Sequence, residues 1–352
     1  ILLKSALLAV LLLTLQGIVF AQDDDEKAPL EISGSVDAYF RANLNATSDL
    51  DEGAPQTGTS FANRPGFSLG MANIVLSKSG EKAGFVADLV FGPRGEDAVF
   101  GSPLNAALNG SSGGSAQIVN QLYAYWNVSE NTTLTIGNFN TFLGYEVISP
   151  SANFNYSTSY MFSYGPFSHT GIKADFTFGD FTLMTALMNA TDATEFSPDG
   201  QYFGGVQLGY GGMYLNFLFD DDFFQADLTA GWDLSETFYL GVNATTASDN
   251  FYGAALYLQN SFSDDFSIGL RGEYFSDEGV GALPAIPISE SAFLAAENVI
   301  DLTLSANYSV GDLTFIPEFR IDLYNEDTVV PESGESPQGS LASFVLAAVY
   351  SF

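Results

Sequence analysis

Charged side chains two residues apart are the groups in this sequence whose types and spacing suit an action on a solute. Lys173 precedes Asp175 and Arg271 precedes Glu273, each inside a stretch in which polar and apolar residues alternate. In an extended strand, residues i and i+2 lie on the same face. Each pair would therefore place opposite charges on one surface and set up a transverse field there. A surplus of acids on that surface would attract cations.

The stretches that hold these charges have the alternation of β-strands. Residues 31–44, 224–233 and 298–309 each separate into one apolar and one polar set when counted by two, which is the strand pattern. These segments exceed the roughly five or six residues of a typical soluble strand and suit the roughly 9–11 residues of a tilted strand in a bilayer. Pro317 lies inside one predicted strand. Because proline cannot donate to the ladder, it predicts a bulge there.

The connections between predicted strands alternate in length. Tight turns are predicted at 79–81, 129–131, 179–180, 211–212, 235–236, 263–265 and 311–312, and long loops at 45–66, 93–115, 147–168, 189–200, 277–296 and 325–338. Two connections of the second set, near 220–222 and 248–249, are short. Short periplasmic turns and long extracellular loops are typical of outer-membrane barrels. We therefore expect an all-β fold, a transmembrane antiparallel up-and-down β-barrel of about 16 strands within a range of 14–18. An even number places both termini on the periplasmic side.

Composition excludes several other classes of protein. The chain is 46% hydrophobic, with 31 Phe, 17 Tyr, 35 Gly and no Cys, so neither a disulfide-stapled domain nor a disordered chain fits. A net charge of −32 argues against nucleic acid as a partner, because phosphate binding needs clustered Lys and Arg. A soluble β-solenoid or a pair of sandwiches is the alternative fold. It would have shorter strands and no alternation of short and long connections.

The first residues have the features of a secretory signal peptide. Lys4 precedes an apolar run over residues 5–15, and residues 19–21 suit a signal peptidase. We expect cleavage after Ala21, which gives a signal peptide over 1–21, an acidic linker over 22–29 and a barrel over 30–352. An uncleaved anchor is the alternative, but the run is short for a spanning helix and acids follow it at once.

The last strand ends in a pattern typical of exported barrels. Phe344, Leu346 and Ala348 share one face with Tyr350 and Phe352. A terminal Phe with aromatic residues two and eight positions earlier resembles the signal that the barrel-assembly machinery reads, so Tyr350 and Phe352 are the candidate assembly residues. Together with the signal peptide this predicts a chain in the outer membrane of a Gram-negative bacterium, in contact with lipid and lipopolysaccharide.

The polar faces of the strands would line the lumen of such a barrel. The registers place these pore-lining candidates inward: Asp37, Arg41, Asp88, Lys173, Asp175, Asp227, Arg271, Glu273, Asp301, Glu318, Arg320 and Asp322. A barrel of about 16 strands is too wide for side chains to fill, so water would occupy it. This predicts passive diffusion of small hydrophilic solutes or ions, with a modest preference for cations because acids outnumber bases. The alternative is that these acids only solvate the wall.

Residues 147–168 are the candidate for a constriction of that lumen. The segment is long and nearly uncharged, and its aromatic residues suit packing against the inner wall; the constriction candidates are Tyr156, Tyr160, Phe162 and Tyr164. The alternative is a surface loop whose aromatic side chains pack against one another.

Several stretches resemble a known family once the strands are placed. They are residues 34–40 (GSVDAYF), 58–62 (GTSFA), 85–95 (FVADLVFGPRG), 137–146 (GNFNTFLGYE) and 153–171 (NFNYSTSYMFSYGPFSHTG). Together they resemble the OmpL-like β-barrel porin family of outer-membrane proteins. The resemblance extends over essentially the whole chain after the signal peptide and is densest between residues 34 and 171. It implies an outer-membrane porin of unassigned solute, and it supplies no catalytic residues.

Two other functions stay open from the sequence. An outer-membrane hydrolase would need a base beside a nucleophile; the one histidine, His169, has Ser168 as its neighbour in sequence, which lies on the opposite face of a strand. No nucleophile elbow, metal-ligand cluster or phosphate loop occurs, so the sequence predicts no catalytic residue, cofactor or metal. A non-conducting barrel for structure or adhesion is the second rival. A homo-oligomer is compatible with the sequence.

Overall fold

Because apolar and polar residues alternate along the strands, the barrel wall has an apolar outer face and a polar inner face. In the strand β16 (Asn298–Val310), Ile300, Leu302 and Leu304 are exposed, whereas the intervening polar residues are fully buried. The same inversion holds along β1 (Glu31–Asn43), where Val36 is exposed and Asp37 is buried. Apolar side chains outside and polar ones inside are the distribution that a barrel in lipid requires.

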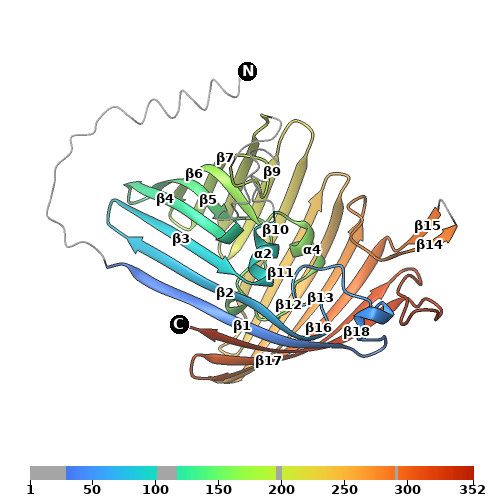
Figure 1. Ribbon diagram of the computed structural model, residues 1–352. Helices are drawn as coiled ribbons and strands as arrows, with labels where there is room; N and C mark the ends of the chain where they lie inside the picture. Colours follow the sequence, from blue (N-terminus) through green and yellow to red (C-terminus); the bar gives the residue numbers. More distant parts are fainter. Residues whose placement is uncertain (1–28, 101–116, 196–199, 290–291) are drawn as a thin grey trace, which may run out of the picture.

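The structure is a computed structural model that describes residues 29–100, 117–195, 200–289 and 292–352. Sixteen of its strands form one closed antiparallel barrel (Figure 1), which confirms the predicted fold class. Besides β1 and β16, the barrel strands are β2 (Gly66–Ser79), β3 (Ala83–Phe91), β4 (Val119–Ser129), β5 (Thr132–Asn140), β6 (Ser168–Phe178), β7 (Phe181–Met188), β8 (Phe203–Tyr210), β9 (Met213–Phe219), β10 (Phe224–Asp233), β11 (Phe238–Ala247), β12 (Phe251–Ser263), β13 (Phe266–Asp277), β17 (Leu313–Tyr324) and β18 (Ser340–Ser351). Each barrel strand pairs with the barrel strands before and after it in the chain, so that β13 pairs with β16, and β1 pairs with β18.

The first and last strands close the barrel by backbone hydrogen bonds. Their register pairs Ser35 with Ser351, and Gly34 and Phe352 exchange two hydrogen bonds of 3.0 Å. The predicted assembly residues Tyr350 and Phe352 therefore lie at this seam, with exposed side chains. Figure 1 shows the seam as the blue β1 lying beside the red β18.

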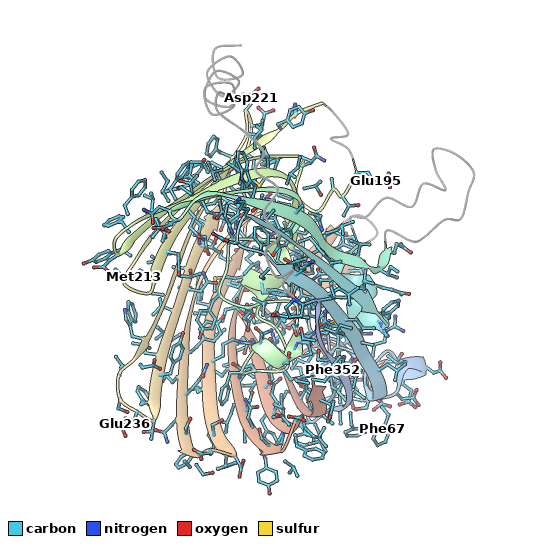
Figure 2. The ribbon with its side chains drawn as sticks, turned by 90° about the vertical axis from the view of Figure 1, so that its left-hand side faces the viewer. Phe67, Glu195, Met213, Asp221, Glu236 and Phe352 are labelled. Atoms are coloured by element: carbon cyan, nitrogen blue, oxygen red, sulfur yellow. The ribbon has the colours of Figure 1, made fainter. Side chains whose placement is uncertain are left out.

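The two ends of the barrel differ in their connections. At one end, here called the turn end, two to four residues join each pair of strands, as between β8 and β9 or β10 and β11. At the other end, here called the loop end, most connections are much longer, and the stretch between β5 and β6 is an example. The connection between β13 and β16 carries the hairpin β14 (Ala285–Ser289) and β15 (Ala292–Ala295). Met213 and Glu236 mark the turn end in Figure 2, whereas Asp221 and Glu195 belong to loop-end connections.

The predicted bulge at Pro317 is wrong. The pairing of β17 with β18 passes through Pro317, opposite Leu346, without a shift, and β17 keeps one register with β16 on both sides of it. The strand therefore accommodates the missing donor without an inserted residue. The predicted signal peptide and nearly all of the acidic linker lie outside the described residues. No described helix is both long and apolar enough to cross a membrane.

Several loop-end connections turn into the barrel. The short helices α2 (Pro93–Ala98) and α4 (Tyr160–Tyr164) lie within the outline of the barrel in Figure 1. Tyr160 and Met161 of α4 join inward-facing residues of β12, β13, β17 and β18 in one packed cluster, and Ala98 of α2 joins residues of β2 and β3 in another. Tyr156, which precedes α4, packs in a third cluster with residues of β1, β17 and β18. The turn η3 (Pro150–Ala152) precedes α4, and η1 (Leu50–Glu52) lies exposed between β1 and β2. One side of the lumen is thus filled with protein.

Candidate functional site in the barrel lumen

The connection between β5 and β6, residues 141–167 and here called the inner loop, lies inside the barrel. Tyr156 and Tyr160 have no exposed surface, and Phe162 and Phe167 are also buried. Tyr156, Tyr160 and Phe162 belong to the predicted constriction set. Its fourth member, Tyr164, is half-buried. A buried loop must satisfy its backbone groups without water. The wall supplies the partners.

Two wall carboxylates each bind two consecutive backbone amides of the inner loop. Glu318 accepts from the N–H of Tyr156 at 2.8 Å and of Ser157 at 3.1 Å. Glu273 accepts from the N–H groups of Tyr160 and Met161, both at 2.8 Å. The second pair are first-turn amides of α4, where a negative charge is favourable. Both carboxylates are buried, so hydrogen bonds to them are strong.

Two wall arginines bind backbone carbonyl oxygens of the same segment. Arg271 donates to the carbonyl oxygen of Ser157 at 2.7 Å, and Arg320 donates to that of Thr158 at 2.8 Å. Both guanidinium groups also pair with Asp301, at 2.8 and 3.0 Å. Two further ion pairs complete the network, Arg271 with Glu146 of the inner loop at 2.7 Å and Arg320 with Asp322 at 2.7 Å. Each guanidinium thus joins wall carboxylates to the inner loop.

Inward-facing glycines of the wall receive side chains of the inner loop. A Cβ at Gly269 would lie 2.4 Å from the ring of Phe154, and one at Gly241 would lie 2.6 Å from the hydroxyl of Tyr145. Gly205 and Gly253 likewise leave room for Phe142 and Met161. Because any larger residue would collide with these side chains, the glycines act as sockets for the inner loop.

A second segment covers the inner loop from the loop end. Arg94, in α2, donates to the carbonyl oxygens of Ile148 at 3.0 Å and Tyr156 at 3.3 Å. Its guanidinium lies 4.3 Å from the ring centre of Phe61, which belongs to the β1–β2 connection. Three loop-end connections therefore pack on one another inside the lumen.

Burial sets the protonation of the inner-loop tyrosines. It raises the pKa of Tyr156 and of Tyr160 well above the usual value, so both hydroxyls stay protonated and can donate. The Tyr156 hydroxyl donates to Asp37 on β1. Beyond the inner loop, burial raises the pKa of Asp192 to about 6. The hydrogen bonds that its carboxylate accepts from the backbone N–H groups of Ser168 and Phe167 act in the opposite direction and lower this pKa.

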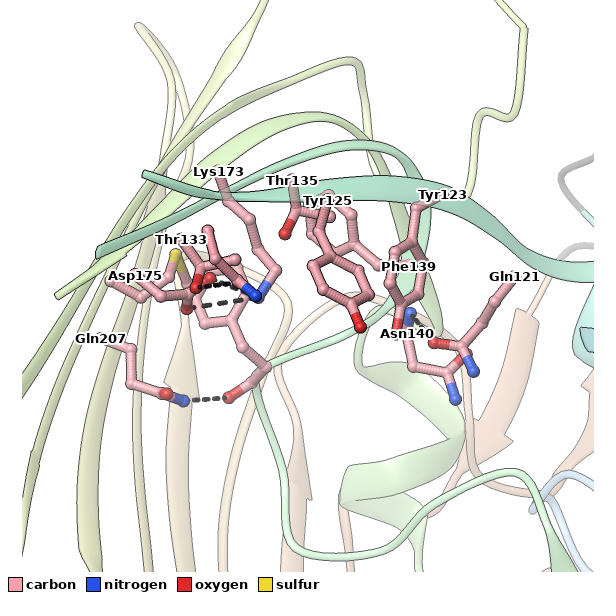
Figure 3. A pocket seen from close by; sticks show the side chains of 13 residues that line it. Gln121, Tyr123, Tyr125, Thr133, Thr135, Phe139, Asn140, Lys173, Asp175 and Gln207 are labelled. Carbon is pink, nitrogen blue, oxygen red and sulfur yellow. Dashed lines mark hydrogen bonds and ion pairs between the residues drawn. The ribbon is translucent and has the colours of Figure 1, made fainter. Parts of the chain in front are cut away.

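Two cavities flank the inner loop. The β4–β8 cavity, of 460 Å³, is lined by residues of β4, β5, β6, β7 and β8 and by Phe142 (Figure 3). The β11–β12 cavity, of 490 Å³, is lined by the inner loop, by residues of β11 and β12 and by Asn307 on β16. The first cavity extends from residues near the turn end, such as Asn127, to residues near the loop end, such as Asn140. The wall from β4 to β8, which carries this cavity along its length, is here called the open side of the lumen.

The predicted pore-lining residues all come from inward positions but have two different surroundings. Lys173 and Asp175 line the β4–β8 cavity and form an ion pair of 2.9 Å. The other ten are buried: Asp37, Arg41, Asp88, Asp227, Arg271, Glu273, Asp301, Glu318, Arg320 and Asp322. Most of these hold the inner loop or neighbouring wall residues, as described above. Whether they act on a permeating solute stays a prediction.

Sequence reasoning missed the partners that hold the inner loop. Glu146, Arg94 and Tyr145 were not singled out, although all three contact the loop or the wall. Glycines at inward positions of long strands are a signal that would have found the sockets, because a strand otherwise disfavours glycine.

His169 has a structural environment. It is fully buried, its Nε2 lies 3.0 Å from the hydroxyl of Thr141, and the rings of Phe139 and Phe142 pack against it. The hydroxyl of Thr141 also accepts from the N–H of Leu143, which fixes the first turn of the inner loop. Nδ1 has no hydrogen-bond partner among the described residues, so no acid orients the ring as in a catalytic triad. Among the described residues no group of His, Asp or Glu has a metal-binding arrangement.

Replacing Glu273 and Glu318 by Ala should free the inner loop. Hydrogen bonds to charged groups contribute about 1.5–3 kcal/mol each, so amide exchange at residues 156, 157, 160 and 161 should rise about 10- to 100-fold. Hydrogen exchange of the protein in detergent, read by mass spectrometry, measures this, with Glu236→Ala at the exposed turn end as the control. Unchanged protection in the double variant would contradict the role of the two carboxylates.

Comparison with known proteins places the chain in a family. Among curated proteins none matches significantly. The outer-membrane channel DcaP of Acinetobacter baumannii has a similar fold, with a TM-score of 0.55 at 11% identity over 95% of this chain and 100% of that one. OmpT of Vibrio cholerae in its trimer form has a TM-score of 0.52 at 10% identity over 93% of this chain and 100% of that one. A mutant porin of Rh. blastica has a TM-score of 0.50 at 11% identity over 92% of this chain and 100% of that one.

These structures share the fold alone with this chain. The family described as "Putative beta-barrel porin-2, OmpL-like" has a sequence profile that matches residues 29–352. This confirms the resemblance that the sequence motifs indicate. The family and the barrel together imply an integral protein of the outer membrane. The chain belongs to the OmpL-like β-barrel porin-2 family.

Proposed function

We propose that the protein is a porin through which small hydrophilic solutes diffuse passively along the wall from β4 to β8. The observation that carries this is the β4–β8 cavity, whose lining includes amide, hydroxyl and charged side chains and reaches from the turn end towards the loop end. The inner loop fills the opposite side and narrows the lumen, so Tyr156, Tyr160, Phe162 and Tyr164 would act as a constriction by bulk and position. No metal or cofactor is needed for such passage.

A non-conducting barrel for structure or adhesion is the second candidate. Three loop-end connections pack inside the lumen, and their buried side chains form continuous clusters. Such filling would also suit a closed barrel. Ion current through the purified protein distinguishes the two functions, because a closed barrel conducts nothing. A hydrolase has less support, since His169 is buried and has no acidic partner within the described parts of the chain.

The surroundings of the barrel follow from the same proposal. A signal peptide cleaved after Ala21 would export the chain, and the barrel-assembly machinery would read Tyr350 and Phe352. Both termini would then lie in the periplasm, and the loop end would face outward beside lipopolysaccharide in a Gram-negative outer membrane. A solved structure of OmpT from Vibrio cholerae is described as a trimer form, and a homo-oligomer is the corresponding proposal for this chain.

Replacing Tyr156, Tyr160, Phe162 and Tyr164 by Gly should raise the conductance in planar bilayers. The inner loop occupies a large part of a lumen that a 16-stranded wall leaves wide, so we expect an increase of about twofold. Phe293→Gly, in the exposed hairpin β14–β15, is the matched control and should leave the conductance unchanged. An absence of current in the unmodified protein would reject the porin, and an unchanged conductance in the variant would reject the constriction.

A modest preference for cations is part of the proposal. Asp88 and Asp227 accept hydrogen bonds from neutral donors and have no cationic partner among the described residues. Asp88 contacts Gln121, and Asp227 contacts Asn216, which binds Gln207. Gln121 and Gln207 both line the β4–β8 cavity. Unpaired acids directly behind this lining would attract cations into it.

The reversal potential in a KCl gradient should therefore have the sign of a cation-selective pore. Lys173→Gln should increase the selectivity and Asp175→Asn should decrease it, because each removes one charge from the β4–β8 cavity. The two variants serve as controls for each other, since both break the same ion pair. A reversal potential of the anion-selective sign in the unmodified protein would contradict the preference.

A further inference from the structure

The open side of the lumen is aromatic as well as polar. Four rings line the β4–β8 cavity: Tyr123 and Tyr125 on β4, Phe139 on β5 and Phe142 at the start of the inner loop. Figure 3 shows the rings of Tyr123 and Tyr125 beside each other on the wall, above the inner loop. Each ring offers a flat face on which the C–H groups of a solute can pack, and each tyrosine adds a hydroxyl at its edge.

The polar groups between the rings have unused hydrogen-bonding capacity. Among the described residues the hydroxyls of Tyr123 and Tyr125 have no protein partner. The side-chain oxygen of Asn140 is buried and also has no partner in the described chain. Buried polar atoms are normally satisfied by protein, water or a ligand. The cavity therefore offers donors and acceptors that water or a solute can use.

The charges in the β4–β8 cavity cancel locally. The Nζ of Lys173 lies 2.9 Å from Asp175 and 5.6 Å from the ring centre of Phe139. Figure 3 shows the pair on β6, on the same wall as Tyr125, with Thr135 of β5 between Lys173 and Tyr125 in the strand register. A paired ammonium and carboxylate give a solute one more donor and one more acceptor without a net charge. A charged solute would have to break this pair to gain from either group.

We propose that the β4–β8 cavity is a binding site for a neutral polyhydroxylated solute, such as a saccharide, on its way through the pore. The proposal rests on the porin function proposed above. One face of a pyranose presents C–H groups that pack on aromatic rings, and its rim presents hydroxyls that both donate and accept. The site provides rings in Tyr123, Tyr125 and Phe142, and polar groups in Asn140, Lys173 and Asp175. Its 460 Å³ lies within the range of about 300–1,000 Å³ of small-molecule pockets.

The β11–β12 cavity is a weaker candidate for the same role. It contains Glu146, whose carboxylate is bound to Arg271, and part of its lining is the inner loop itself. A solute there would contact groups that already hold the inner loop. The β4–β8 cavity instead is lined almost entirely by strands, which hold a binding site more rigidly than a loop does.

Ion current through the purified full-length protein in planar bilayers tests the site, with maltose as the probe. Maltose should reduce the current in a saturable manner, whereas a polyethylene glycol of similar size should reduce it only in proportion to its concentration. Replacing Tyr123 and Tyr125 together by Ala should weaken maltose binding about tenfold, since both stacking faces are lost. Tyr125→Phe, which keeps the ring, should cause a smaller loss. Tyr214→Ala is the control, because Tyr214 faces inward on β9 but does not line the cavity.

The outcomes separate the site from the channel. Ion current in the absence of sugar shows that each variant has folded and inserted, so a loss of maltose binding with current retained supports the site. Current that maltose and polyethylene glycol reduce alike overturns the binding site and leaves the porin intact. The same is true if succinate, a charged probe, saturates and maltose does not. A protein without current would reject the porin function itself.

Discussion

Polar groups buried between the inner loop and the wall must find partners without help from bulk water, and this constraint determines how the inner loop lies. Glu318 and Glu273 accept consecutive amides of the loop, while Arg271 and Arg320 bind its carbonyl oxygens. Removing one of these charges would leave its partners buried and unpaired, which is far more costly than the net contribution of the hydrogen bond. The loop is therefore held in one position by wall groups of both signs.

This arrangement divides the lumen into a filled and an open side. Apolar clusters around Tyr156 and Tyr160 occupy the side of β1, β12, β13, β17 and β18, and the β4–β8 cavity remains on the other. The charges that hold the inner loop are already paired, so few groups face the open side. They are one ion pair, several amides and hydroxyls, and aromatic rings. The selectivity of the pore would then depend on these groups and on the unpaired acids behind them.

The sequence predicted the wall better than its contents. Alternation with period two is a local signal, so the face of Asp37 or Asp301 could be assigned from its neighbours alone. The aromatic residues of the inner loop are unusual for a solvated loop, and they alone predicted packing against the inner wall. The charges that hold this loop could not be matched in the same way, because Glu146 and Arg271 are far apart in the chain, and sequence alone does not show which charges meet. Pro317 shows the opposite error, since a local rule predicted a bulge that the two neighbouring strands overrule.

The central claim is that the inner loop is docked on the inner wall, and a designed disulfide tests it directly. The chain has no native cysteine. A Cβ at Gly253 would lie 2.9 Å from the Cγ of Met161, close enough for the bonded geometry once the backbone shifts slightly from the carbonyl oxygen of Tyr274, which would lie at 2.7 Å. Met161→Cys combined with Gly253→Cys should oxidise to an intramolecular disulfide, visible as a mobility shift on a non-reducing gel. Met161→Cys combined with Gly272→Cys, whose second position faces outward, should not. A free pair of thiols at 161 and 253 after oxidation would contradict the docked loop.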